Sequence, residues 1–120
     1  MLFTLHLQLA TMATIFTLLL ALWGFLRYMQ GQGVDGSYLG AVVIGEGLLV
    51  VQGALGGLMM GAGAQPARPA IHILYGLVAL LSFPALYAFT QGRDSRREML
   101  LWALIALFVF GVTIRARLVA

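Results

Sequence analysis

LFTLHLQLATMATIFTLLLALWGFLRY, residues 2–28, is apolar over almost its whole length and has no charged side chain before Arg27. A helix needs about 20 consecutive, mostly apolar residues to cross a bilayer. A secretory signal would instead show a basic start, a shorter apolar core and a small-residue cleavage site. We therefore expect residues 2–28 to form an uncleaved membrane span.

Three further apolar segments follow, separated by short polar or glycine-rich connections. We expect the four spans at residues 2–28, 38–61, 69–90 and 99–115. Pro69 suits the first position of the third helix, and Pro84 is expected to kink that helix. The sequence therefore predicts a single all-α integral membrane domain over residues 1–120, a four-helix transmembrane up-down bundle.

The composition supports this class, because 62% of the residues are hydrophobic and only 9% are charged. A soluble domain is about half apolar and a quarter charged. We expect the lipid bilayer to surround the chain and no nucleic acid to bind it. Cysteine is absent, which excludes disulfides, thiolate metal sites and covalent haem attachment. Histidine is the strongest soft-metal ligand that is left.

The basic residues suggest both a source and an orientation. The chain has arginine but no lysine or asparagine, which fits a GC-rich bacterial genome. One side of the expected bundle carries four arginines, Arg27, Arg93, Arg96 and Arg97. The other side carries three, Arg68, Arg115 and Arg117. Because positive charge favours the cytoplasmic side, we expect a multi-pass protein of the bacterial plasma membrane with both termini in the periplasm.

The two histidines of the chain, His6 and His72, each lie about one helical turn inside an expected span. The up-down arrangement places both on the same side, roughly 5 Å below the surface. Ligating groups inside a span usually mark function, and two imidazoles at one depth suit the axial positions of a haem iron. Zinc or copper would normally use more protein ligands. The alternative is that each histidine bonds a backbone carbonyl at the interface.

Two motifs near the connection of the second and third spans extend this interpretation. Residues 52–60, QGALGGLMM, precede residues 70–74, AIHIL, and His6 lies on the helix before both. This arrangement resembles the haem A synthase family, in which a Gln-x-x-x-Gly helix precedes a helix that opens with an Ala-x-His motif. The likeness covers roughly residues 1–90. It implies one haem b, with His6 and His72 as the axial ligands that bind its iron at the outer face.

The chain also departs from that family. The family has eight spans in two related halves, whereas four are expected here, so the likeness extends to one half. The family's Glu three residues before the first histidine is here Phe3, and its Arg after that histidine is here Leu7. The resemblance therefore implies haem ligation without the family's oxidation of a haem methyl group. Whether the chain is an enzyme stays open.

The second span carries small residues at helical spacing, Gly53, Gly57 and Gly61. Such a stripe allows close helix packing, including a homodimer, or forms a flat wall for a porphyrin. In the second case Gly57 and Gly61, nearer the histidines, contact the cofactor. Arg68 and Arg115 lie on the histidine side and are expected to pair with haem propionates, because arginine forms bidentate bonds with carboxylates.

Glu46 is the one carboxylate inside an expected span, and it lies nearer the surface opposite the histidines. Three roles fit an intramembrane acid at this position: an ion pair with Arg27, contact with a proton path or a quinone, or a proton-coupled transport site. Gln8 and Gln52 are expected to form hydrogen bonds between helices.

The function that these residues favour is that of a cytochrome-like membrane protein. It would bind one haem b for electron transfer or haem handling, with a quinol or another redox subunit as its partner. Two alternatives fit the same chain length and hydropathy, a small proton-coupled exporter and a structural subunit of a respiratory or photosynthetic complex.

Overall fold

The computed structural model describes all residues from Met1 to Ala120 and consists of four α-helices without strands. These are α1 (Leu2–Met29), α2 (Gly36–Gly61), α3 (Pro69–Thr90) and α4 (Arg96–Leu118). Each is long and apolar enough to cross a membrane. The predicted four-helix membrane bundle is confirmed, and the main difference is that α4 extends beyond the expected residues 99–115 at both ends.

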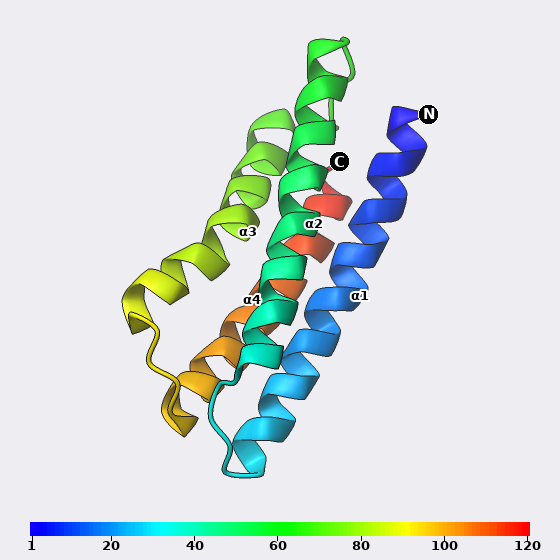
Figure 1. Cartoon of the computed structure of the whole chain (residues 1–120). Helices are drawn as coiled ribbons and strands as arrows, with labels where there is room; N and C mark the ends of the chain where they lie inside the picture. The colour runs from blue at the N-terminus through cyan, green and yellow to red at the C-terminus, as the bar shows by residue number, and fades with distance from the viewer.

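The four helices run alternately up and down (Figure 1). α4 packs most extensively against α1 and next against α3, whereas α2 packs mainly against α1. The backbones of α1 and α3 do not touch, so these two helices lie on a diagonal of the bundle. The contact between α2 and α3 is the smallest, and Figure 1 shows α3 bending away from α2 along its second half, which contains Pro84.

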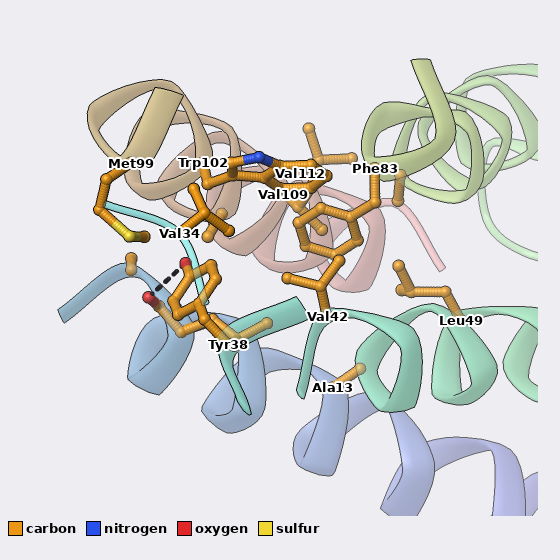
Figure 2. Packing of buried hydrophobic residues seen from close by; sticks show 14 residues of the cluster. Ala13, Val34, Tyr38, Val42, Leu49, Phe83, Met99, Trp102, Val109 and Val112 are labelled. Atoms are coloured by element: carbon orange, nitrogen blue, oxygen red, sulfur yellow. Dashed lines mark hydrogen bonds between the residues drawn. The ribbon is translucent and has the colours of Figure 1, made fainter. Parts of the chain in front are cut away.

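The packed core lies toward the end of the bundle that carries the α1–α2 and α3–α4 connections, which we call the packed end. Its largest fully buried side chains include those of Tyr38, Phe83, Met99 and Trp102 (Figure 2). The rings of Phe83 and Trp102 stack with centroids 6.3 Å apart. The buried hydroxyl of Tyr38 donates a hydrogen bond of 2.9 Å to the carbonyl of Leu20. Aromatic packing and a satisfied hydroxyl thus join α1, α2, α3 and α4 at this end.

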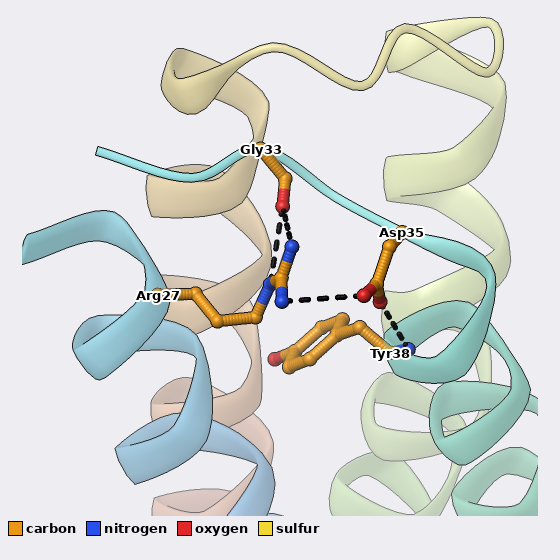
Figure 3. A network of polar contacts seen from close by, with 4 residues as sticks. All are labelled: Arg27, Gly33, Asp35 and Tyr38. Carbon is orange, nitrogen blue, oxygen red and sulfur yellow. Dashed lines mark hydrogen bonds and ion pairs between the residues drawn. The ribbon is translucent and has the colours of Figure 1, made fainter. Parts of the chain in front are cut away.

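A polar network closes the α1–α2 connection (Figure 3). The Arg27 guanidinium forms an ion pair of 3.2 Å with Asp35 and donates two hydrogen bonds to the carbonyl of Gly33, of 3.1 and 2.6 Å. Asp35 also accepts a 2.8 Å hydrogen bond from the backbone N–H of Tyr38, and so caps α2. Of the three roles considered for Glu46, the ion pair with Arg27 does not form, because Arg27 pairs with the loop carboxylate of Asp35 instead.

Gly24 lies where α1 and α4 approach each other closely. A Cβ atom at this position would lie 2.9 Å from the Ala103 Cβ and 2.9 Å from the Tyr38 hydroxyl. We expect Gly24→Leu to lower the free energy of unfolding by about 1–3 kcal/mol through overpacking. Unfolding by sodium dodecyl sulfate, followed by far-ultraviolet circular dichroism, measures the change.

Gly47→Leu is the matched control for this variant, because a Cβ at Gly47 meets no atom within 4 Å. Both substitutions exchange a helical glycine for leucine, so the gain in helix propensity is the same. Equal stability of the two variants would contradict the close α1–α4 packing.

Candidate functional site

The structure brings the two histidines together at the end of the bundle opposite the packed end. His6 lies in the second turn of α1 and His72 in the first turn of α3. Their ring centroids are 6.5 Å apart and their planes are inclined by 65°. Since α1 and α3 lie on a diagonal, the two imidazoles meet across the interior of the bundle. We call this part of the molecule, residues 1–12, 56–78 and 113–120, the histidine end.

The ring of His72 is held in one orientation by α4. Its Nδ1 lies 2.9 Å from the carbonyl oxygen of Ala116, one of the last four carbonyls of α4, which have no partner within the helix. A carbonyl only accepts, so Nδ1 is the donor in this contact, and in the neutral ring Nε2 then has the free lone pair. This is the arrangement in which a histidine is prepared to bind a metal through Nε2.

The ring of His6 lies beside α2 and is less completely bonded. A Cβ built on Gly56 would lie 3.3 Å from the His6 Cε1 and 3.9 Å from its Nε2, so only glycine leaves the ring its full space. The His6 Nδ1 is buried without a hydrogen-bond partner. The side-chain oxygen of Gln52, one turn before Gly56, is also buried without a partner, so its expected hydrogen bond between helices does not form. Such orphaned buried atoms are rare in proteins and mark places that need an explanation.

The histidine end has no packed core. None of its residues is buried, whereas buried residues occur throughout residues 13–55 and 79–112. Small side chains lie one turn beyond each histidine, Ala10 on α1 and Gly76 on α3, and a Cβ at Gly76 would meet nothing within 4 Å. Protein interiors are normally closely packed. The histidine end is thus less closely packed than the rest of the bundle.

The glycine stripe lies on a different face of α2 from the one next to His6. A Cβ at Gly53, Gly57 or Gly61 would meet no atom within 4 Å, so no other helix of the chain packs against the stripe. The neighbouring Gly56 is the residue that borders His6. The roles of Gly57 and Gly61 as a cofactor wall, and of the stripe as a homodimer face, stay predictions.

The arginines of the histidine end differ in their contacts. Arg117 donates hydrogen bonds to the Leu7 carbonyl and the Thr11 hydroxyl, and so joins α4 to α1. The side chains of Arg68 and Arg115 are exposed and make no hydrogen bond or ion pair within the chain. They remain the arginines that are available to a negatively charged group at this end.

Sequence analysis missed two parts of this site, Gly56 and the Ala116 carbonyl. Gly56 lies within the glycine-rich residues 52–60, but periodicity does not show which face of α2 borders His6. No residue pattern identifies Ala116, because its contact is made by a backbone atom of a distant helix.

Comparisons of the chain with models of known protein families, with curated proteins and with solved structures found no match. The resemblance to the haem A synthase family, which depends on the motifs around His6 and His72, stays a prediction.

Two adjacent glycines allow a direct test of this geometry. We expect Gly56→Leu to weaken haem binding by the histidine pair at least about ten-fold, because the new side chain displaces the His6 ring by overpacking. Gly57→Leu is the control, since its side chain enters open space. Haem content and the absorption spectrum of each purified variant give the answer. Loss of haem from Gly57→Leu alone would instead assign the cofactor to the glycine stripe.

Proposed function

We propose that the chain binds one b-type haem between His6 and His72 in a bacterial plasma membrane, and that it serves electron transfer or haem handling. The separation of the two imidazoles carries this proposal. A metal–imidazole bond is about 2 Å long and the nitrogen lies about 1.1 Å from its ring centroid, so two opposed ligands hold their centroids about 6.3 Å apart. The centroids of the two rings lie 6.5 Å apart, close to that separation.

The donor set also favours haem over a bare metal ion. The chain has no group of three or more His, Cys, Asp or Glu side chains that could hold an ion. Zinc and copper sites use such groups, whereas a haem brings four of its own ligands and needs only two from the protein. The absence of a packed core at the histidine end also supports a bound group there.

The residues around the two histidines would hold the haem in different ways. Ala116 fixes the His72 ring, Gly56 leaves room for the His6 ring, and Arg68 and Arg115 offer bidentate partners for propionates. Haem with both axial positions closed by histidine carries electrons and does not activate oxygen. A quinol or another redox subunit is the partner that this chemistry requires.

The first test is the colour of the protein. Purified from haem-replete cells, it is expected to show a low-spin b-type spectrum, with haem that acidified acetone extracts because no cysteine tethers it. His6→Ala and His72→Ala should each abolish the low-spin spectrum, because each removes one axial ligand. Gln8→Ala, which removes an exposed polar side chain two residues from His6, should leave it unchanged.

A colourless wild-type protein, or full haem retention in both histidine variants, would contradict the proposal. The small proton-coupled exporter would then become the better candidate. One observation favours it, since the buried Oε1 of Glu46 has no hydrogen-bond partner and the carboxylate no ion pair.

The proposed orientation has a test of its own. A phosphatase fused after Ala120 should be active in the periplasm, and a fluorescent protein inserted at Gln91 should be active in the cytoplasm. Replacing Arg93, Arg96 and Arg97 with glutamine should produce a mixed population, because these residues supply the excess of positive charge. The opposite activities in the wild-type chain would place the histidine end on the cytoplasmic side.

A further inference from the structure

A second unfilled place lies in the half of the bundle away from the histidines. It is a cleft of about 180 Å³ between α2 and α3, bordered also by α4, on the side where α3 bends away from α2 (Figure 1). Its walls are apolar and aromatic, with Phe83, Tyr87 and Trp102 among them. Its one charged lining residue is Glu46 of α2.

Glu46 finds no partner within the chain. Its Oε1 is buried and accepts no hydrogen bond, and the Arg27 expected to pair with it is bound to Asp35 and Gly33 instead. A buried polar atom without a partner is costly, and a ligand that supplies a hydrogen bond removes that cost. The carboxyl group of Glu46 therefore favours a ligand that carries a hydroxyl or another polar donor.

The cleft opens sideways, toward the hydrocarbon of the bilayer. Val43 and Tyr87, which border it, are 70% and 54% exposed on the outer surface of the bundle. Both lie on helices that cross the membrane. A ligand that enters here comes from the lipid phase, so it must itself be largely apolar.

The size of the cleft limits the part of the ligand that it encloses. Sites that surround a whole drug-sized molecule measure about 300–1,000 Å³, so a cleft of about 180 Å³ takes one substituted six-membered ring and leaves the remainder in lipid. Aromatic walls favour a flat ring, which packs against Phe83 and Trp102. Pro84 has no N–H, so the carbonyl of Leu80 in the preceding turn lacks its usual donor.

We propose that this cleft binds the ring of a hydroquinone-type molecule dissolved in the bilayer, with a ring hydroxyl bonded to the carboxyl group of Glu46. A carboxyl oxygen accepts the ring hydroxyl, and the flat ring lies among the aromatic walls. A lipophilic cation is the competing ligand class, but bulky organic cations exceed the volume for one ring. The inference extends the proposed function by giving a quinol a place on the chain, yet its test measures binding alone.

The two tryptophans of the chain make the test possible. Trp102 lines the cleft, whereas Trp23 borders a separate groove between α1 and α2. The protein is labelled with 5-fluorotryptophan, placed in lipid nanodiscs and titrated with trimethylhydroquinone under argon, and ¹⁹F NMR follows both signals. We expect the Trp102 signal to shift with saturation. The Trp23 signal should change only in proportion to the hydroquinone dissolved in the bilayer.

Three variants show whether Glu46 holds the ligand. Glu46→Leu should raise the apparent Kd about ten-fold or more, because the hydrogen bond is lost. Glu46→Gln keeps an oxygen acceptor and should stay within about three-fold of the wild type. Gln52→Leu removes another unpartnered polar side chain of α2, outside the cleft, and should leave the Kd unchanged.

Two results would overturn the proposal. A Trp102 signal that does not saturate, or that Glu46→Leu leaves unaffected, means that the hydroquinone only dissolves in the lipid. Saturable binding of tetraphenylphosphonium that both Glu46 variants abolish, without hydroquinone binding, would make this a cation site. His72→Ala should show the same hydroquinone Kd as the wild type, so failure of the haem proposal and failure of this one remain distinguishable.

Discussion

The exclusion of water from the bilayer is the constraint on which the rest of this structure depends. Backbone groups must be satisfied within each segment, and of 97 backbone hydrogen bonds 81 lie within the helices. Side chains obey the same rule, as the hydrogen bond from Thr14 to Thr113 between α1 and α4 illustrates. Buried side-chain atoms without a partner occur on three residues, His6, Glu46 and Gln52. Two of these residues, His6 and Glu46, border the sites for which we propose a ligand.

The two ends of the bundle differ in what stabilises them. At the packed end, Tyr38, Trp102 and two alanines of α4, Ala103 and Ala106, are almost completely buried, and the Arg27 network closes the connection between α1 and α2. The histidine end has no buried residue and is joined by a few polar contacts, among them that of His72 with Ala116. The packing that stabilises the bundle therefore lies mainly outside the histidine end.

Hydropathy and helix geometry were enough to predict the four spans and the common depth of His6 and His72, because the rise per residue of a helix is fixed. They did not predict the ends of α4. Near its first residue, Ser95 donates a hydrogen bond to Glu98, and at both ends the helix continues beyond the apolar segment. They also did not predict that Arg27 pairs with Asp35, because that contact depends on the path of the loop between α1 and α2. Gly56 and Gly57 lie about 100° apart around α2, and sequence periodicity does not fix the rotation of a helix about its own axis. The sequence therefore did not single out Gly56 as the glycine that borders His6.

Both candidate sites border α2 and α3, which have the smallest contact of any neighbouring pair in the bundle. Gly56 and His72 lie at one end of this seam, and Glu46 and Pro84 lie at the other. Glu46 precedes Gly56 by ten residues, about 15 Å along the helix. α4, packed against both α1 and α3, supplies most of the interhelical packing, so α2 and α3 need not close against each other. Both of the sites for which we propose a ligand thus lie along the most loosely closed seam of the bundle.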